Sequence, residues 1–600
     1  MKVERHGDAW SVTGSWYRLA GVVGTGVAVL DDVAGERWAE LRLLTSVDTI
    51  DGPDETLAVA GPAFEPLGER RVRLTWTLAS SRWVARRLVI EADDTGPVVH
   101  AEVEGTGRPT EVSILSGRAV LARTTGTLMS GAWFETLFCS SPTHPARILK
   151  PASESALIGV VSGSEPGRGN WFFTPAPFLY AASRSAPASP TTMPAGPWLT
   201  FGLEVAGEAG FTGFGYRAVD RGFGFVLDYE GKTPVAGAWS SPRIAIGRAD
   251  DPYAAIAAQR ERSPVRRERS PAGAPARAEP RRGPDWWREP IFCGWGAQCA
   301  MARAAGESFG AGPTYSTMVN YDAFLGHLEA RGVVPGTIVV DDKWMSAYGT
   351  CEPDVTRWPD LRGWIARRRE RDQHVLLWYK AWDPEGLPAE CSVRSTAGTP
   401  LGIDPTHPDG EAAVRRAIRR MLAPDQLDAD GLKIDFTART PSGVATEHHG
   451  GAWGVDLLRR LLDTVADEAR RIKPEALLVG HTPNSLVASA VDMIRLNDTL
   501  RLDDPGPRVD VVPQMRYRAA VVRAACPGHL VDTDDWCAPD LAGWRAYAEV
   551  KPTLGVPALY YATALDLTGE AFEERDYAML RRTWADYRQA QGLPARTTAG

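Results

Sequence analysis

Eight short apolar segments recur through the second half of the sequence, and this rhythm constrains the fold more than any other feature. Stretches with apolar residues at helical spacing separate most of them, which is typical of repeated βα units. The segments are "IFCGW" from residue 291, "TIVVDDKW" from 337, "HVLLWYKAW" from 374, "GLKIDF" from 431, "ALLVGHT" from 476, "VDMIRLND" from 491, "GHLVDTDDW" from 528 and "PALYYAT" from 557. Eight such strands predict a (β/α)8 TIM barrel over residues 289–595.

The segments between the predicted strands supply the outer helices of this barrel. The clearest helical pattern follows the fourth strand, and its apolar positions are Val455, Leu458, Leu461, Leu462, Val465 and Ala469. We expect these side chains to pack against the outside of the strands. The gap between the fifth and sixth segments is too short for a full helix.

The first part of the chain has a different pattern. Apolar and polar residues alternate along short runs, and turns rich in Gly, Asp and Pro separate the runs. The clearest of these runs begin at Trp10, Tyr17, Arg70, Val98 and Phe201. Alternation of this kind is typical of strands that bury one face. Residues 1–245 are therefore predicted to form an antiparallel β-sandwich domain, so that the whole chain is multidomain.

A segment rich in Arg, Pro, Ala, Ser and Glu separates the two patterns. It contains "RERSPVRRERSPAGAPARAEPRRGPDWW", which has too few apolar residues to build a core. Residues 246–288 are therefore predicted to be a linker between the sandwich and the barrel.

Charge and composition argue against several classes of partner. The chain has 67 basic and 75 acidic residues, a net charge of -8, and no long block of one sign, so nucleic acid is not an expected partner. No run approaches the length of a membrane span, and the polar N-terminus lacks the apolar core of a secretory signal. We therefore expect a cytoplasmic protein without a membrane partner. Whether it forms a homo-oligomer is left open.

The seven cysteines give no sign of a structural role. Their number is odd and none is in CxxC spacing, so the sequence predicts neither a disulfide framework nor a zinc site.

Polar and aromatic residues gather where the predicted strands end. In a TIM barrel the carboxyl ends of the strands form the active-site face, so these side chains should meet at one mouth. In chain order they are Trp295, Asp341, Asp342, Trp344, Trp378, Lys380, Trp382, Lys433, Asp435, His481, Arg495, Asp498, Asp532, Asp534, Asp535 and Trp536.

Two of these carboxylates are suited to glycoside chemistry. Retaining glycosidases need one carboxylate to attack the anomeric carbon and another to protonate the leaving oxygen, about 5–5.5 Å apart. Asp435 on the fourth strand and Asp498 after the sixth can provide such a pair. Lys433 lies two positions before Asp435 on the same side of the strand, and its ammonium group would favour an ionised nucleophile. Desolvation and the neighbouring anion should raise the pKa of Asp498.

Other roles are open to these residues. An Asp at a strand end is often a helix N-cap or part of an ion pair, and we expect this of Asp428, Asp430 and Asp492. A metallohydrolase is a competing hypothesis, because His448, His449, His481 and His529 also lie in the barrel region. Adjacent histidines are poorly spaced as ligands, and no HxH pair closes the first strand. We therefore expect no metal, and chelation would test this directly.

Four segments of the barrel resemble blocks of the family-36 glycoside hydrolases, which belong to the clan of retaining α-galactosidases. They are "VVDDKW" at 339–344, "LLWYKAW" at 376–382, "LKIDF" at 432–436 and "IRLND" at 494–498. The resemblance implies that Asp435 is the nucleophile and Asp498 the acid/base. It departs from the family at the fifth strand, where "GHTPN" stands in place of a Gly-rich block, and after the third strand, where Lys380-Ala381 replaces Glu-Pro.

The resemblance also implies sugar contacts. Asp341 and Asp342 would bind hydroxyl groups, Lys433 would contact the sugar beside the nucleophile, and Trp295 and Trp344 would wall the site. From their positions at strand ends we add a second group of substrate-binding candidates, which are Trp378, Lys380, His481, Arg495 and Asp535.

The sequence thus predicts a retaining α-glycosidase, α-galactosidase-like, that acts on terminal α-linked sugars of an oligosaccharide or glycoside without metal or organic cofactor. Two alternatives remain open. One is a transglycosylase of the raffinose or stachyose synthase type, and the other is a glycan-binding protein without catalysis. The sugar, its linkage and its leaving group are not specified by the sequence.

Overall fold

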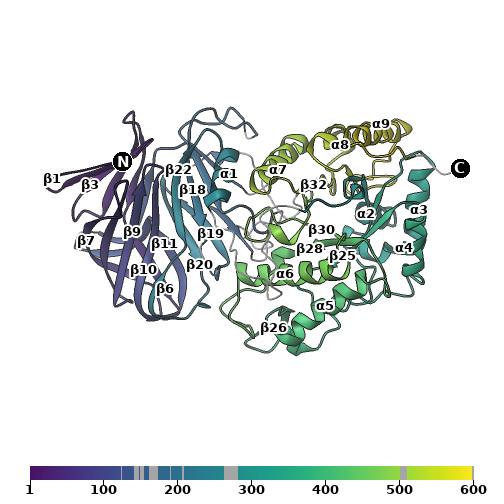
Figure 1. Ribbon diagram of the computed structural model, residues 1–600, viewed down its shortest axis with the longest axis horizontal. Coiled ribbons are helices and arrows are strands. Elements are labelled where there is room, and N and C mark those ends of the chain that lie inside the picture. Colours follow the sequence, from purple (N-terminus) through teal and green to yellow (C-terminus); the bar gives the residue numbers. More distant parts are fainter. Residues whose placement is uncertain are drawn as a thin grey trace.

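The computed structural model describes residues 1–122, 124–140, 147–148, 155–160, 173–189, 191–205, 209–262, 281–500 and 510–596. An N-terminal domain of strands lies beside a C-terminal domain in which helices surround a central sheet (Figure 1). The predicted order of a β-sandwich followed by a (β/α)8 barrel is therefore confirmed.

Twenty-two strands build the described part of the N-terminal domain, and nearly all of their pairings are antiparallel, with β7 and β12 as a parallel exception. The strands are β1 (Lys2–His6), β2 (Ala9–Thr13), β3 (Tyr17–Val22), β4 (Val27–Asp32), β5 (Arg37–Arg42), β6 (Thr45–Thr49), β7 (Glu55–Pro66), β8 (Arg71–Ser80), β9 (Ala85–Asp93), β10 (Pro97–Gly107), β11 (Pro109–Ile114), β12 (Ser116–Leu121), β13 (Thr124–Ala132), β14 (Thr136–Cys139), β15 (Arg147–Ile148), β16 (Ala156–Gly159), β17 (Leu179–Ser183), β18 (Trp198–Glu204), β19 (Gly213–Val219), β20 (Gly222–Asp228), β21 (Val235–Ser240) and β22 (Arg243–Ala249).

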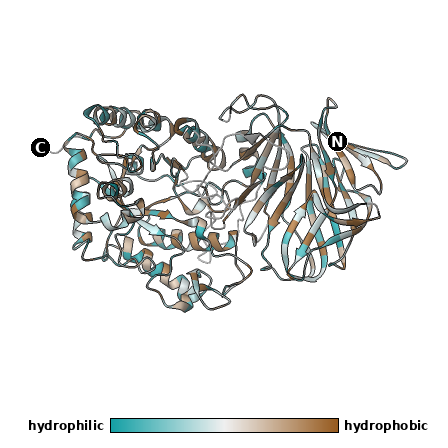
Figure 2. Ribbon diagram, turned by 180° about the vertical axis from the view of Figure 1, so that it is seen from behind, coloured by the Kyte–Doolittle hydropathy of each residue, from teal (hydrophilic) through white to brown (hydrophobic). Residues whose placement is uncertain are grey.

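The sandwich core follows from alternation along these strands. In β8, Val72, Leu74, Trp76 and Leu78 are buried while the residues between them are more exposed, and Figure 2 shows the alternating colours on the strands. Aromatic side chains from different ladders fill the space between the layers. For example, Phe201 of β18 meets Phe225 of β20 at 4.8 Å between ring centroids, although the two strands share no hydrogen-bonded register.

Eight parallel strands form the barrel of the C-terminal domain. They pair in the order β32, β31, β30, β28, β25, β24, β23, β33, and a parallel bridge between Asp532 and Val556 closes the circle. Their bounds are β23 (Ile291–Cys293), β24 (Thr337–Val340), β25 (His374–Lys380), β28 (Gly431–Asp435), β30 (Leu477–Gly480), β31 (Met493–Arg495), β32 (Leu530–Asp532) and β33 (Ala558–Leu559). The strands are mainly apolar, with polar residues concentrated toward their carboxyl ends, because helices cover them outside and side chains fill them inside.

The helices alternate with the strands as predicted. The α-helices of the chain are α1 (Pro252–Arg262), α2 (Trp295–Ala304), α3 (Met318–Glu329), α4 (Leu361–Arg369), α5 (Pro408–Leu422), α6 (Val455–Ile472), α7 (Val511–Ala525), α8 (Leu541–Leu554) and α9 (Glu574–Gln591). All six apolar positions predicted in α6 are at most 1% exposed. The short connection between β30 and β31 holds one 3-10 turn, η5 (Ala488–Ala490), as its length requires.

Smaller elements complete the barrel domain. A three-stranded antiparallel sheet of β26 (Ser392–Ser395), β27 (Pro400–Ile403) and β29 (Thr446–Glu447) rises from the loops after β25 and β28. The remaining 3-10 turns are η1 (Asp285–Arg288), η2 (Phe309–Tyr315), η3 (Ala389–Cys391) and η4 (Thr437–Arg439).

The segment predicted as a linker carries structure at both of its ends. Strand β22 continues to residue 249, and helix α1 packs against β18 and α7 at the junction of the domains (Figure 1). In α1, the Gln259 side-chain amide donates to the Leu203 carbonyl oxygen at 2.6 Å. Residues 263–280, the most Arg- and Pro-rich part of that prediction, lie outside the described residues.

The sandwich contacts the barrel at the carboxyl ends of its strands. The amide of Asn484, in the loop after β30, donates to the Ala176 carbonyl oxygen at 2.8 Å, and the His481 carbonyl oxygen accepts from the Thr174 amide at 3.3 Å. The N-terminal domain therefore borders the face on which an active site of this fold lies.

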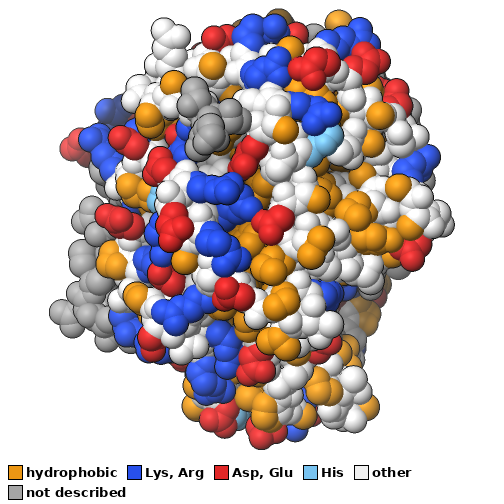
Figure 3. All heavy atoms as spheres, turned by 90° about the vertical axis from the view of Figure 1, so that its right-hand side faces the viewer, with side chains coloured by type: hydrophobic (Ala, Val, Ile, Leu, Met, Phe, Trp, Pro, Cys, Tyr) orange, Lys and Arg blue, Asp and Glu red, His pale blue; other side chains and the backbone are white. Residues whose placement is uncertain are grey.

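The side of the barrel domain that points away from the N-terminal domain presents an ordinary charged surface. Figure 3 shows Lys and Arg side chains interleaved with Asp and Glu on this side. None of the helices in the described part of the chain combines the length and apolar character that a membrane crossing requires.

The packing of α6 generates a stability prediction. We expect Leu461→Ala to lower the free energy of unfolding by about 2–5 kcal/mol, because a fully buried side chain leaves a cavity against the strands. The matched control on the same helix is Asp467→Ala, at an exposed position, with an expected change within about 0.5 kcal/mol. Denaturant unfolding monitored by circular dichroism measures both, and equal effects would contradict this packing.

Candidate active site

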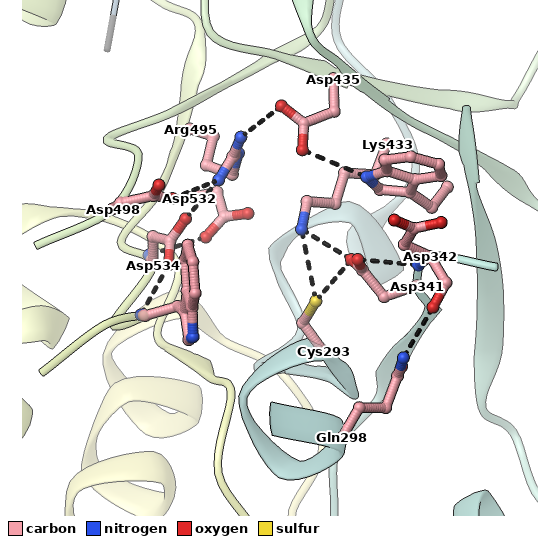
Figure 4. Close-up of polar contacts among 12 residues, drawn as sticks. Cys293, Gln298, Asp341, Asp342, Lys433, Asp435, Arg495, Asp498, Asp532 and Asp534 are labelled. Carbon is pink, nitrogen blue, oxygen red and sulfur yellow. Dashed lines mark hydrogen bonds and ion pairs between the residues drawn. The ribbon is translucent and has the colours of Figure 1, made fainter. Parts of the chain in front are cut away.

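Side chains from five strands of the barrel, or from the loops directly after them, converge at the carboxyl ends of the strands. Figure 4 shows them as two groups, one around Lys433 and the other around Arg495, with Asp435 between. The residues that the structure brings together are Cys293, Asp341, Asp342, Lys433, Asp435, Arg495, Asp498, Asp532 and Asp534. They lie at the ends of β23, β24, β28, β31 and β32 or directly after them, and they meet because parallel strands of one barrel end on the same face.

The first group is a buried ion pair with a thiol. The ammonium of Lys433 donates to Asp341 Oδ2 at 2.7 Å and to Cys293 Sγ at 3.4 Å, and the thiol donates to the same carboxylate at 3.0 Å. Burial lowers the pKa of Lys433, but the charge of Asp341 outweighs burial and raises that pKa above its ordinary value. Lys433 therefore stays charged inside the barrel.

Asp435 is held by donors on both of its oxygens. Oδ1 accepts from the Arg495 guanidinium and from the Phe436 amide, each at 2.9 Å, and Oδ2 accepts from the Trp378 indole at 3.1 Å. Trp344 donates its indole N–H to the Trp378 carbonyl oxygen at 2.9 Å and so lies behind this contact. These bonds fix the orientation of a carboxylate that keeps about a fifth of its surface exposed, at 20%.

One guanidinium joins the second group to the first. Arg495 contacts Asp534 at 2.7 Å and Asp498 at 3.4 Å through Nη1, while its Nη2 holds Asp435. Asp498 and Asp435 therefore face the same space from two non-adjacent strands (Figure 4). Asp534 is fully buried, so the ion pair with Arg495 compensates its charge.

The carboxyls of Asp435 and Asp498 differ in their tendency to hold a proton. Burial raises the pKa of Asp435, but the charges of Arg495 and Lys433 outweigh it and hold that pKa well below its usual range. Burial raises the pKa of Asp498 to about 7 against the pull of Arg495, with the negative charges of Asp534 and Asp435 adding to the rise. At neutral pH the site thus holds one ionised carboxylate beside one carboxyl that can carry a proton.

The backbone is strained beside each of these residues. Phe436, directly after Asp435, has φ of 60°, and Asn497, directly before Asp498, has φ of 68°. Asp534 also has a positive φ, at 34°. Left-handed conformations cost non-glycine residues free energy and cluster at functional sites, where the surrounding structure imposes them.

A buried arginine supports the loop that carries Asp498. Arg518 of α7 donates to the carbonyl oxygens of Leu496, Asn497 and Asp498 at 2.9, 3.1 and 2.6 Å. Three carbonyl groups that would otherwise point into the protein interior are thereby satisfied, which stabilises the strained turn.

A second carboxyl with a raised pKa lies at the mouth of the barrel. Burial raises the pKa of Asp342 to about 7, although its hydrogen bond from the Tyr348 hydroxyl, at 2.8 Å, opposes the rise. Lys380 lies 3.8 Å above the centroid of the Tyr348 ring and pairs with Asp383 at 2.8 Å. Lys380 is therefore at the rim, beside Asp342, rather than in contact with Asp435.

His481 lies at the back of the site as a neutral ring. Burial and the nearby Arg495 lower its pKa to about 4, and its Nε2 contacts the Thr437 hydroxyl. Trp295 is displaced from the predicted position at a strand end, because β23 ends at Cys293 and Trp295 begins helix α2.

Several strand-end residues are not brought to this cluster. Asp535 accepts from Lys551 at 2.6 Å and from the indole of Trp544 at 2.9 Å, fully buried between β32 and α8. It is an internal ion pair, so our expectation that it contacts substrate has no geometric basis. As expected, Asp430 and Asp492 have structural contacts, accepting from the amides of Val375 and Leu478.

The histidines considered as metal ligands do not converge. His529 contacts the Ala488 carbonyl oxygen, while His448 and His449 line a separate cavity of about 720 Å³ between the domains. Among the described residues, no group of three or more His, Cys, Asp and Glu side chains is arranged to hold a metal ion.

Two residues of the site, Cys293 and Tyr348, were not predicted, and a third, Asp534, was expected at the mouth without a role. Cys293 gave no motif, and Asp534 was one of several aspartates after the seventh strand whose directions the sequence does not reveal. Tyr348 lies in the long loop after β24, where no periodicity indicates which side chains turn inward.

Comparisons with known proteins agree on the fold. Searches against protein-family models and against curated proteins find no match. A GH31 family sulfoquinovosidase from E. rectale matches with a TM-score of 0.56 and 10% identity, covering 98% of this chain and 83% of that one. A cycloalternan-degrading enzyme from Trueperella pyogenes matches with a TM-score of 0.50 and 12% identity, covering 97% and 82%.

A cycloalternan-forming enzyme from Listeria monocytogenes, solved with a pentasaccharide substrate, matches with a TM-score of 0.51 and 10% identity. The alignment covers 98% of this chain and 54% of that chain, so the protein spans about half the length of this relative. At such identities the likeness concerns the fold, a sandwich followed by a barrel.

Proposed function

We propose that this protein is a retaining α-glycosidase in which Asp435 is the nucleophile and Asp498 the general acid/base. The observation that carries the proposal is that two carboxyls with opposite pKa shifts contact the same guanidinium. A double displacement needs this combination, one carboxylate that is ionised and one carboxyl that holds a proton.

In the first step, an oxygen of Asp435 attacks the anomeric carbon as the bond from that carbon to the leaving oxygen breaks. Asp498 gives its proton to the leaving oxygen, so the leaving group departs as a neutral alcohol and Asp435 becomes a glycosyl ester. Trp378 and the Phe436 amide keep the carboxylate of Asp435 in place during the attack.

In the second step, Asp498 is ionised and takes a proton from a water molecule. The water oxygen attacks the anomeric carbon, the ester bond to Asp435 breaks, and the sugar leaves with its original configuration. Asp498 is again protonated at the end, and no metal or organic cofactor is required.

The remaining polar residues of the site are proposed to bind the sugar. Asp341 and Asp342 would accept from hydroxyl groups, with Lys433, Arg495 and the aromatic Trp378 around the same ring. The resemblance of the barrel blocks to family 36 favours an α-galactoside, and the similar solved structures support a carbohydrate-active enzyme at the level of the fold. A screen of nitrophenyl α-glycosides tests the sugar.

Azide rescue distinguishes the two roles. We expect Asp435→Ala to lose several orders of magnitude in kcat, and azide to restore turnover as a β-glycosyl azide because it enters from the face that Asp435 occupied. In Asp498→Ala, azide should instead attack the glycosyl ester and yield the α-glycosyl azide. NMR of the products determines the anomeric configuration of the azide. Asp535→Asn is the control, and azide should not change its kcat. An unchanged kcat in Asp435→Ala would contradict the proposed role of Asp435 as nucleophile.

The pH dependence follows from the raised pKa of the acid. Asp498 must be protonated to act, so kcat/KM for unactivated substrates should fall as pH rises through about 7. The pKa of Asp435 lies far below this range, so protonation of the nucleophile gives no acid limb between pH 5 and 6. Asp498→Ala, assayed with an activated aryl glycoside, should lack the alkaline limb. A profile that stays level to pH 9 in the unaltered protein would contradict the assignment.

A further inference from the structure

We propose that Trp295, Phe309 and Trp536, here called the aromatic rim, form the binding site for the leaving group of the substrate. The ligand class is a leaving group that presents a flat ring face, such as a second pyranose. This inference rests on the proposed function, because it takes Asp498 as the residue that protonates the leaving oxygen.

The aromatic rim lies on the side of the site from which the leaving group departs. Trp536 accepts through its carbonyl oxygen from the amide of Thr499, the residue after Asp498, and its own amide donates to Asp534 at 2.9 Å. The Thr499 hydroxyl also donates to the next carbonyl oxygen, that of Cys537, at 2.8 Å. These bonds join the loop of the acid/base to the loop of Trp536, so a group that receives a proton from Asp498 leaves beside this indole.

The three rings form one cluster contributed by helix α2, the 3-10 turn η2 and the loop after β32. Trp536 lies edge-on to Trp295, with ring centroids 5.5 Å apart, and tilted against Phe309 at 6.2 Å. The indole N–H of Trp536 donates to Asp566 at 2.9 Å, which fixes the ring from the loop after β33. The indole of Trp536 is therefore held in one orientation, and the other two rings pack against it.

Phe309 is the most exposed ring of this surface. It is 49% exposed, whereas Trp536 is 9% exposed and Trp295 is partly buried. An exposed phenylalanine packed against the buried indole of Trp536 provides an apolar face next to a polar site. Sugars and aryl groups use such faces, because the axial hydrogens of a pyranose ring pack on aromatic carbon.

The experiment compares substrates with and without a ring in the leaving group. For Phe309→Ala we expect kcat/KM to fall roughly 3- to 10-fold on the p-nitrophenyl α-glycoside and on a disaccharide of the same sugar. The glycosyl fluoride of that sugar should be unaffected, since fluoride has no ring to bind. Phe309→Tyr keeps the ring and should behave as the unaltered protein. Val319→Ala, which truncates an exposed side chain on α3, is the matched control and should leave kcat/KM unchanged for all three substrates.

The outcomes distinguish this inference from the proposed glycosidase function on which it rests. Equal loss on the fluoride and the ring-bearing substrates would mean that Phe309 supports the fold or the sugar site, and would overturn the aromatic rim. No change on any substrate would overturn it as well. If no glycosyl fluoride is turned over by the unaltered protein, or if Asp435→Ala still hydrolyses it, the proposed glycosidase function fails instead.

Discussion

A single guanidinium shared by three carboxylates is the interaction on which the site depends. Arg495 lies between Asp435, Asp498 and Asp534, and without it these negative charges would face one another in a largely buried space. The guanidinium does not set the pKa of the carboxyls alone. Asp435 also faces Lys433 and stays ionised, whereas at Asp498 burial and the charges of the two other carboxylates outweigh the guanidinium and raise the pKa to about 7. Division of labour between two identical side chains thus follows from their surroundings.

The fold makes this arrangement possible. Short parallel strands place Lys433 and Asp435 at the end of β28 and Arg495 at the end of β31, so residues some sixty positions apart meet at one mouth. Outer helices then support the loops, as Arg518 of α7 does for the turn before Asp498. The sandwich closes against the same face through the loop after β30. Left-handed residues beside both carboxyls are tolerated because these contacts over-determine the turns.

The architecture was predictable from the sequence, because periodicity indicates which residues are buried. The meeting of Asp435 and Asp498 at one mouth was predictable too, because parallel strands of a barrel end on a shared face. All the predicted apolar positions of α6 are buried, and Lys433 and Arg495 lie in the site as expected. The direction in which each side chain of a loop points was not predictable. Asp534 and Asp535 are neighbours, yet the first holds Arg495 and the second pairs with Lys551, and no sequence pattern distinguishes them. Helix α1 was missed because its residues carry little apolar periodicity.

The measurement that tests the central claim most directly is covalent trapping of the intermediate. Incubation with a 5-fluoro α-glycosyl fluoride of the preferred sugar should slow hydrolysis of the glycosyl ester enough for mass spectrometry of a peptic digest. We predict one added sugar per chain, on the peptide that contains Asp435, and no label in Asp435→Ala. A label on Asp498 or another residue, or turnover with inversion of the anomeric configuration, would contradict the assignment of Asp435 as nucleophile.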